Sequence, residues 1–326
     1  MAGDQLLVLN APTLQALITP ELAIAAAREA FELHSSEGGD TYPVVREPLG
    51  QGPAPAVFGI KSGAIESQRL VGLKAAGFWN HNRTLNKPAH QATIVLIDSH
   101  TGRAEALLDG NAITTARTGA AGYWGIQLLA PQAARRICVF GTGVQAQVQL
   151  EYALLARPLA TQVSYISYNA QPDLQFEQHF SARCELRHST HAELAMQEVD
   201  IIITATPGRE VLFEIGALRD GQHINAVGAD TRGKRELPSG TLELASHVWA
   251  DDLTQARELG ESQWCPGLGI EELGALMLGH SSYQRTASDR TVFDMTGLAL
   301  QDLCLARQLV QAAQAQGLGQ HIDWPW

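Results

Sequence analysis

The chain has 326 residues, of which 45% are hydrophobic and 17% charged, and its formal net charge at pH 7 is −11. This is the composition of a globular protein, and the length suits two domains better than one core. The acidic balance argues against nucleic acid and against acidic membrane surfaces as partners.

The cysteines and the N-terminus predict the compartment. Cys138, Cys184, Cys265 and Cys304 are scattered without CxxC or metal-ligand spacing, so we expect free thiols and no metal site. Residues 1–5 lack the basic start of a signal peptide, and no apolar run approaches the length that spans a membrane. These features predict a cytoplasmic protein with no membrane partner.

The first predicted elements are a helix and a sheet. Thr19-Pro20-Glu21 is typical of a helix start with Thr19 as the cap, and Gly38-Gly39 ends the helix. Its apolar stripe repeats at helical spacing: Leu22, Ala26, Ala30 and Leu33. Strand-like runs follow at 55–62, 69–75, 91–98 and 103–109, with a polar loop at 79–90. Runs of strands joined by tight turns predict a mainly antiparallel sheet.

A helix is predicted after Asp109-Gly110, with Thr114, Arg117 and Thr118 on one face. From residue 136 strands and helices alternate, with strands at 136–140, 162–167, 200–204, 223–227, 247–250 and 291–294. A long helix at 298–316 repeats Leu300, Leu303, Ala306 and Val310. The predicted fold class is α/β. A Rossmann-like doubly wound parallel sheet occupies 119–297, and a mainly antiparallel α+β domain for substrate and dimerisation occupies 1–118 plus 298–326.

The turn after 136–140 carries the main functional motif. Gly141 permits a tight turn, Gly143 lets the backbone approach a pyrophosphate, and the following helix offers N–H groups to its charge. Ala146 takes the place of a third glycine, and the helical pattern that follows puts Val144, Val148, Tyr152 and Leu155 on one face. The motif alone also fits an ordinary strand-to-helix turn. The strands that recur downstream favour a dinucleotide site.

Several charged residues stand in unusual settings. Lys74 lies inside an apolar strand, Arg46 follows Pro-Val-Val, and Arg117 lies in a helix rich in Ala, Gly and Thr. Each alone fits a salt-bridged or snorkelling residue, whereas together with a nucleotide fold they suggest a carboxylate site. Asp230 follows the predicted strand 223–227 at the carboxyl edge, where ligands bind, and also fits a cap of the next turn.

The motifs resemble those of the ornithine cyclodeaminase/mu-crystallin family over nearly the whole chain. The matching segments occur in the family's order: Gly72-Leu73-Lys74, Leu108-Asp109-Gly110 with Thr114-x-x-Arg117-Thr118, Gly141-Thr142-Gly143-x-Gln145-Ala146, Val227-Gly228-Ala229-Asp230, Gly233-Lys234-Arg235-Glu236-Leu237 and Thr296-Gly297-x-x-x-x-Asp302.

The resemblance implies a homodimer that binds a small amino or imino acid. It implies that Arg46, Lys74 and Arg117 hold the substrate carboxylate and that Asp230 handles its nitrogen, with Lys74 and Asp230 catalytic. The implied cofactor-binding residues are Arg117, Thr118, Gly141, Thr142, Gly143, Val144, Gln145, Asn169, Thr206, Val227, Gly228, Ala229, Lys234 and Thr296.

Within the family the match is uneven. Cyclodeaminases carry a Thr-Glu-Met type sequence where this chain has Asp109-Gly110-Asn111, and mu-crystallin-like ketimine reductases tend to lack an acid such as Asp230. Residues 43–47, 72–79 and 294–298 look most like iminosuccinate reductases, which make aspartate. We therefore expect an NAD(P)-dependent reductase of a small α-imino acid. A cyclodeaminase-type lyase, a cyclic ketimine reductase and a non-catalytic binding protein are the alternatives.

The cofactor prediction depends on the end of the second Rossmann-like strand. An acid there would bind the ribose 2′-OH of NAD, and an arginine would accept the 2′-phosphate of NADP. Asn169 offers hydrogen bonds to a hydroxyl but no charge to pair with a phosphate, and Arg183 is too far along the next helix. The sequence therefore favours NAD(H) and leaves NADP(H) open.

Overall fold

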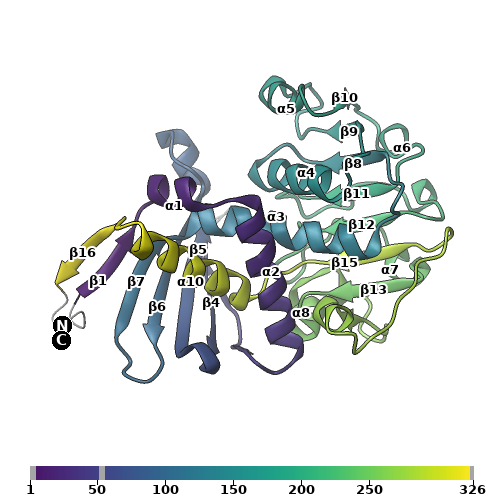
Figure 1. Cartoon of the computed structure of the whole chain (residues 1–326). Coiled ribbons are helices and arrows are strands. Elements are labelled where there is room, and N and C mark those ends of the chain that lie inside the picture. The colour runs from purple at the N-terminus through teal and green to yellow at the C-terminus, as the bar shows by residue number, and fades with distance from the viewer. Residues whose placement is uncertain (1–4, 51–55, 324–326) are drawn as a thin grey trace. The chain divides into compact units, whose positions relative to one another are not determined.

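The computed structural model describes residues 5–50 and 56–323, except the side chain of Arg83. Residues 1–4 of the N-terminal segment, and residue 55 at the start of the predicted strand 55–62, lie outside the described residues. The chain divides into two compact units, Met1–Arg117 with Leu298–Trp326, and Thr118–Gly297 (Figure 1). Each unit has its own sheet, so the mixed α/β fold class is confirmed.

The sheet of the first unit is mainly antiparallel. Its strand order is β16-β1-β7-β6-β5-β4-β2, with β3 also paired to β4, and only the β1–β7 pair is parallel. The strands are β1 (Gln5–Leu9), β2 (Asp40–Thr41), β3 (Val45–Leu49), β4 (Ala56–Ile65), β5 (Leu70–Phe78), β6 (His90–Asp98), β7 (Ala104–Asp109) and β16 (Gln320–Asp323).

Helices α2 (Pro20–Ser35) and α10 (Ala299–Ala315) pack side by side in this unit (Figure 1). The predicted cap is confirmed, because the side chain of Thr19 accepts a hydrogen bond from the N–H of Leu22. Gly72 on β5 leaves room for α10, since a Cβ there would lie 2.6 Å from Leu303. The unit also contains α1 (Ala11–Leu17) and the short 3₁₀ segments η1 (Glu66–Gln68) and η2 (Asn80–Leu85).

The sheet of the second unit is entirely parallel, with the order β10-β9-β8-β11-β12-β15-β13-β14. Its strands are β8 (Arg136–Phe140), β9 (Gln162–Ile166), β10 (Glu185–His188), β11 (Ile201–Thr204), β12 (His223–Ala226), β13 (His247–Ala250), β14 (Glu271–Glu272) and β15 (Thr291–Asp294). The order reverses between β8 and β11. The carboxyl ends of these two strands therefore mark the place where ligands bind in such sheets.

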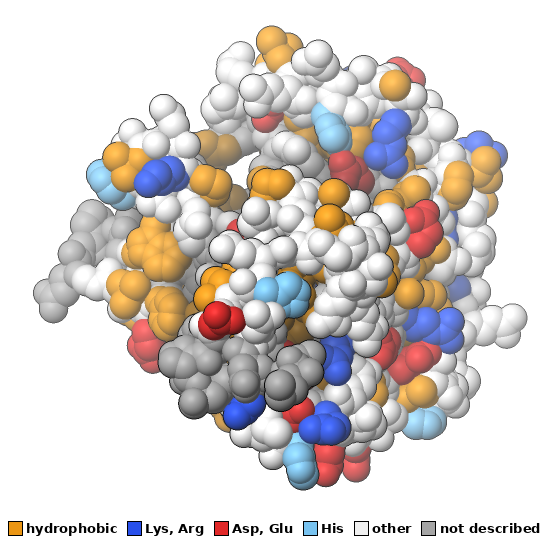
Figure 2. Space-filling model, turned by 60° about the vertical axis from the view of Figure 1, so that its left-hand side comes forward, with side chains coloured by type: hydrophobic (Ala, Val, Ile, Leu, Met, Phe, Trp, Pro, Cys, Tyr) orange, Lys and Arg blue, Asp and Glu red, His pale blue; other side chains and the backbone are white. Residues whose placement is uncertain are grey.

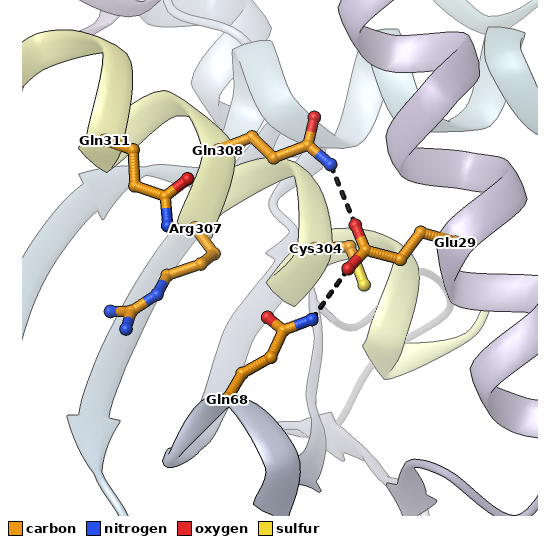
Figure 3. Close-up of a pocket in the computed structure, with 6 residues that line it drawn as sticks. All are labelled: Glu29, Gln68, Cys304, Arg307, Gln308 and Gln311. Atoms are coloured by element: carbon orange, nitrogen blue, oxygen red, sulfur yellow. Dashed lines mark hydrogen bonds between the residues drawn. The ribbon is translucent and has the colours of Figure 1, made fainter.

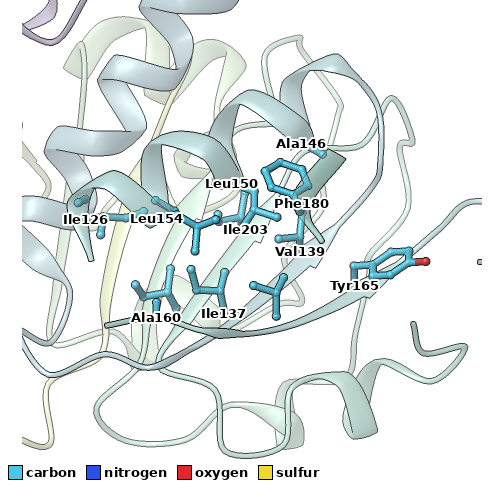
Figure 4. Close-up of a cluster of buried hydrophobic side chains, with 14 of the residues drawn as sticks. Ile126, Ile137, Val139, Ala146, Leu150, Leu154, Ala160, Tyr165, Phe180 and Ile203 are labelled. Atoms are coloured by element: carbon cyan, nitrogen blue, oxygen red, sulfur yellow. The ribbon is translucent and has the colours of Figure 1, made fainter. Parts of the chain in front are cut away.

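Two buried clusters cover the faces of this sheet, as expected of a doubly wound fold. Figure 4 shows one of them, in which Ile137, Val139 and Ile203 of the sheet meet Leu150 and Leu154. The helices and 3₁₀ segments are α4 (Val144–Ala156), α5 (Leu174–Phe180), α6 (Ala192–Ala195), α7 (Thr241–Leu244), α8 (Leu253–Leu259), α9 (Leu273–Met277), η3 (Ile215–Ala217) and η4 (Glu261–Trp264).

Helix α3 (Gly110–Leu129) contains the boundary between the units, after Arg117. Its glycines explain why the helix is rich in small residues. A Cβ on Gly119 would lie 2.5 Å from Tyr152, and one on Gly125 would lie 2.4 Å from Phe293. Glycine in a helix interior lowers helix stability by up to about 1 kcal/mol relative to alanine. Here glycine stands at positions where a neighbouring element packs against the helix backbone.

Some details differ from the prediction. Of the four residues placed on one face of α4, Val148 and Tyr152 are buried and lie against Gly119 of α3, whereas Val144 and Leu155 are 62% and 42% exposed. Strand β10 was not predicted, so Asp230 follows the fifth strand of this sheet in chain order, not the fourth. The loop 79–90 contains the 3₁₀ segment η2.

Figure 2 shows basic and acidic side chains interspersed on the face that it draws. All four cysteines are free thiols, as predicted. Within the described ranges, the helices are too short or too polar to cross a membrane.

Candidate active site

Lys74 is buried in the middle of β5, with 5% of its surface exposed. The alternation of β5 turns it to the face that α10 covers, together with Leu70 and Gly72. Its ammonium donates a hydrogen bond to Oγ1 of Thr114 at 3.2 Å and lies 2.7 Å from Oδ2 of Asp302. A buried lysine is costly unless it is paired, and this pair accounts for its presence in the strand.

Asp302 lies between two cations. Its Oδ1 lies 3.3 Å from Nε of Arg117, and Arg117 also donates from Nη1 to Oε1 of Gln301 at 2.9 Å. Asp302 is 1% exposed and Arg117 is 8% exposed. Helices α3 and α10 and strand β5 thus converge on a buried cluster of Lys74, Arg117 and Asp302, which has one more positive charge than negative. We call these three residues the cation cluster.

The electrostatics of the cation cluster follow from its burial. Burial lowers the pKa of Lys74 to about 7, against the opposing charge of Asp302. Burial alone would raise the pKa of Asp302, but the charges of Lys74 and Arg117 outweigh it and hold that pKa below its usual value. A cluster with excess positive charge and little water attracts an anion, and a carboxylate matches both an arginine fork and a lysine point charge.

Arg46 and Lys61 share the face of the sheet that bears Lys74. Lys61 pairs with Lys74 across β4 and β5, while Arg46 pairs with Gly59, two residues before Lys61. His90 on β6 is hydrogen-bonded through Nδ1 to Asn111 at 2.8 Å, and burial lowers its pKa. Two of the predicted carboxylate-binding residues, Arg46 and Lys74, thus lie on one face of the sheet, and the structure adds Lys61 to that face.

The Gly141–Gly143 turn has the shape that a pyrophosphate needs. Gly141 has φ +105°, and a Cβ there would lie 2.7 Å from the carbonyl oxygen of Ala205. Gly143 is the N-cap of α4, makes no side-chain cap bond, and would place a Cβ in open space. The first N–H groups of α4 therefore point at an open position. These residues fit a dinucleotide's phosphates.

A pocket of about 420 Å³ lies beside this turn. Its lining residues come from the ends of β8 and β9 and the start of α5: Thr142, Ser167, Tyr168, Asn169, Pro172, Asp173, Leu174 and Gln175. Tyr168 and Leu174 are exposed apolar groups at its rim. A hydrogen bond from Thr142 lowers the pKa of Asp173, so this carboxylate is ionised at neutral pH. The sequence offered no acid at the end of the second Rossmann-like strand, where Asn169 stands. Asp173 brings a carboxylate into the same pocket as Asn169.

Lys234, Thr206 and Asp230 lie beyond the ends of β11 and β12. Nζ of Lys234 donates to the carbonyl of Thr206 at 3.1 Å and lies 3.6 Å from Oδ1 of Asp230. The Asp230 side chain is 38% exposed, and its Oδ1 also accepts from the hydroxyl of Thr231. Asp230 is therefore an accessible carboxylate with a lysine nearby.

The other predicted cofactor residues are largely tied to the protein itself. The hydroxyl of Thr296 donates to Oδ1 of Asp251 at 2.8 Å. The carbonyl of Thr118 accepts from Nε2 of Gln149 at 2.6 Å, and Gly228 donates its N–H to Glu236. These positions shape the sheet edge through the backbone.

A second pocket, of about 330 Å³, lies in the first unit and is lined by α2, α10 and the segment η1 (Figure 3). Its carboxylate, Glu29, accepts hydrogen bonds from Gln68 at 2.6 Å and Gln308 at 2.8 Å. Arg307 pairs with Glu105 at 2.8 Å, and burial raises the pKa of the Cys304 thiol. The polar groups satisfy one another, and we assign this pocket no chemistry.

Besides Lys61, the structure adds three acids to the predicted site residues: Asp302, Asp173 and Glu236. Asp302 and Glu236 were part of the matched motifs, but no role could be inferred for them because their partners are distant in sequence. Asp173 lies four residues beyond Asn169, the position expected to choose the cofactor.

A parallel sheet with an open Gly-x-Gly turn at its switch point defines a dinucleotide-binding protein, and the cation cluster adds an anion site. The chain is 31% identical to iminosuccinate reductase of Paracoccus denitrificans (strain Pd 1222), covering 98% of this chain and 100% of the relative. The structure of the Paracoccus enzyme with NAD+ matches with a TM-score of 0.88 at 30% identity, over 98% and 99% of the two chains.

Two further structures match over similar lengths. An archaeal alanine dehydrogenase dimer with bound NAD has a TM-score of 0.90 at 27% identity, over 98% of this chain and 99% of its own. The Δ1-pyrroline-2-carboxylate reductase of Thermococcus litoralis, with NADH and L-proline, has a TM-score of 0.89 at 25% identity, over 97% and 100%.

The family model of the ornithine cyclodeaminase/mu-crystallin family matches residues 20–317. The chain belongs to this family, as its motifs indicated, and it is an oxidoreductase.

Proposed function

We propose that the protein reduces a small α-imino acid to the amino acid with NADH. One observation carries the proposal: Lys74 and Arg117 share a single carboxylate, Asp302, in a buried place with excess positive charge. A second carboxylate, from a substrate, would neutralise that excess. The named relatives act on imino and amino acids, which all present such a group.

The carboxylate would bind to the remaining donors of the cation cluster. Among the described residues, Lys74 has Thr114 and Asp302 as partners, which leaves one of its three N–H bonds. Arg117 contacts Gln301 and Asp302 and has further N–H groups. Arg46 lies on the same face of the sheet and is the third predicted contact.

Asp230 would act on the substrate nitrogen. A protonated imine accepts a hydride far better than a neutral one, and a carboxylate stabilises that cation. When bound, NADH would supply the hydride to C2 of the protonated imine. The C=N electron pair would pass to nitrogen, which gives the amine and NAD+. Lys74 and Arg117 hold the carboxylate throughout, so their contribution is positioning and electrostatics.

Asp173 supports NAD(H) as the cofactor over NADP(H). Its ionised carboxylate lies in the pocket beside the Gly-x-Gly turn, where the adenosine ribose of a dinucleotide would bind. A carboxylate accepts hydrogen bonds from ribose hydroxyls and repels a 2′-phosphate. Asn169 lines the same pocket and adds no positive charge.

We also propose that the protein is a homodimer joined through the first unit's sheet. The face that turns away from α10 carries an apolar row across neighbouring strands, Val8, Leu107, Val95 and Leu73, and each is only partly buried. The solvent face of an antiparallel sheet is normally polar. A second copy would cover this row.

The function is tested by titrating NADH and NADPH with oxaloacetate, pyruvate and a cyclic ketimine, each with ammonium, beside ornithine with NAD. We expect NADH oxidation that requires both a keto acid and ammonium. Ammonia release from ornithine without net change in NADH would replace the reductase by a cyclodeaminase. Oxidation of NADH or NADPH with the cyclic ketimine alone would indicate a ketimine reductase. No turnover with any of these compounds would indicate a binding protein.

A further inference from the structure

Two buried acids of the second unit form successive links between loops. Asp294, at the end of β15, accepts hydrogen bonds from the N–H of Glu261 at 3.0 Å and of Ser262 at 2.8 Å. Glu261 accepts in turn from the N–H of Glu236 at 2.6 Å and of Leu237 at 3.1 Å. Both acids are almost fully buried. The end of β15 thereby fixes the backbone on either side of Glu236.

Glu236 is the last link, and it joins two loops of the predicted cofactor site. Its Oε1 accepts from the N–H of Thr206 at 2.8 Å and from the Thr206 hydroxyl at 2.6 Å. Its Oε2 accepts from the N–H of Gly228 at 3.0 Å. Glu236 is fully buried, and each of these bonds is donated to it, which is the pattern of a carboxylate acceptor.

Glycines stand where the carboxylates approach the backbone. A Cβ on Gly228 would lie 2.1 Å from Oε2 of Glu236, and a Cβ on Gly260 would lie 2.5 Å from Oδ1 of Asp294. Gly228 was predicted as a cofactor contact, and the structure gives it a different reason. It must lack a side chain because Glu236 occupies that space.

The loop after β11, which Glu236 holds through Thr206, also packs against the Gly-x-Gly turn. Thr206 follows Ala205, whose carbonyl oxygen would lie 2.7 Å from a Cβ on Gly141. Lys234 reaches the carbonyl of the same Thr206 from the other side. The loop after β11 therefore lies directly against Gly141 of the Gly-x-Gly turn, so a shift of this loop would disturb the turn.

We propose that Glu236 is a positioning residue for the dinucleotide: it holds the loops after β11 and β12 in the binding arrangement, and Glu261 and Asp294 hold Glu236. The proposal rests on the proposed function only in placing the cofactor at this sheet edge. It does not depend on which substrate is reduced.

The test is NADH binding without substrate, followed by fluorescence, for Glu236→Gln beside Glu258→Gln, which changes an exposed glutamate of the same unit. Glutamine has one oxygen and one NH₂ group where Glu236 has two oxygens. The NH₂ group cannot accept a hydrogen bond, so the N–H of either Thr206 or Gly228 loses its acceptor. We expect the dissociation constant of NADH to rise roughly tenfold or more in Glu236→Gln, which is the scale of one lost charged hydrogen bond. In Glu258→Gln the dissociation constant should not change. A folded Glu236→Gln that binds NADH like wild type would overturn the proposal.

A double-mutant cycle keeps the proposal testable if Glu236→Gln does not fold. Gly228→Ala should weaken NADH binding, whereas Gly228→Ala combined with Glu236→Ala should be no weaker than Glu236→Ala alone, because the clash is then gone. Additive losses would show that Gly228 contacts the cofactor directly, and would contradict the proposal. A wild type that binds NADH but reduces no imino acid refutes the function and leaves this inference standing.

Discussion

The charge on Lys74 depends on pH in the physiological range, because burial lowers its pKa to about 7. The groups around it are Asp302, Arg117, Lys61 and His90, and burial lowers the pKa of His90, so that ring is mainly neutral at pH 7 and above. Lys74 carries its charge below its pKa and loses it above. Anion binding by the cation cluster should therefore be strong at low pH and weaken as pH rises.

The prediction is measured as the dissociation constant of pyruvate, without ammonium, from the NADH complex between pH 5.5 and 9. This dissociation constant should be level below about pH 7 and then rise, approaching tenfold for each further pH unit as the protonated fraction of Lys74 falls. A constant that stays level to pH 9 would show that Lys74 does not bind the carboxylate.

Asp230→Asn tests the role of the exposed acid beyond β12. The neutral amide cannot stabilise an iminium, so hydride transfer in a single turnover should slow by orders of magnitude. NADH affinity should stay near wild type, because asparagine has the same shape as Asp230 and its side-chain oxygen still accepts from the hydroxyl of Thr231. Transfer at the wild-type rate would show that Asp230 is only a turn residue.

At the scale of elements, the β9–α5 connection decides the cofactor. Asp173→Asn keeps an N-cap acceptor for the N–H of Phe176 but removes the charge from the pocket. We expect the preference for NADH over NADPH to fall by roughly tenfold, since a like charge a few ångströms away costs about 1–4 kcal/mol. Glu185→Gln, an exposed change in the next strand, is the control. An unchanged ratio of kcat/KM values would exclude Asp173 as the selector.

Elements with strong local signals were predicted from the sequence, and those held by distant partners were not. Strand β8 and helix α2 were predicted because an apolar run and a Thr-Pro start are local features. Strand β10, Glu-Leu-Arg-His, has no such pattern and exists because it pairs with β9. Periodicity placed Val144 on one face with Val148 and Tyr152, but it cannot tell a core face from a ligand face, and Val144 is exposed.

The site shows the same division. Lys74 and Arg117 stood out as charges in apolar or small-residue settings, which is a local signal. Their shared partner Asp302 is brought to them by α10 from the far end of the chain, and no spacing rule connects them. Glu236 is likewise defined by bonds to Thr206 and Gly228 that only the folded sheet edge creates.

At the scale of the whole molecule, the apolar row on the first sheet predicts the dimer. Val95→Lys places a charge on that face without touching the core, because its neighbours Ile94 and Leu96 point to the other side. Sedimentation should show a dimer for wild type and for the exposed-turn variant Thr101→Lys, and a monomer for Val95→Lys. A monomeric wild type, or a fully dimeric Val95→Lys, would refute this interface.

The most direct test of the account is the activity of Lys74→Ala and Arg117→Ala beside Lys87→Ala, which removes an exposed lysine. Removing one partner from a buried ionic group costs roughly 3–5 kcal/mol, so circular dichroism serves as the check that each variant is folded. We predict that both folded variants lose kcat/KM for the imino acid by a hundredfold or more, corresponding to about 2–3 kcal/mol for a charged contact. Lys87→Ala should retain full activity. A folded Lys74→Ala or Arg117→Ala with kcat/KM near that of wild type would contradict the carboxylate site.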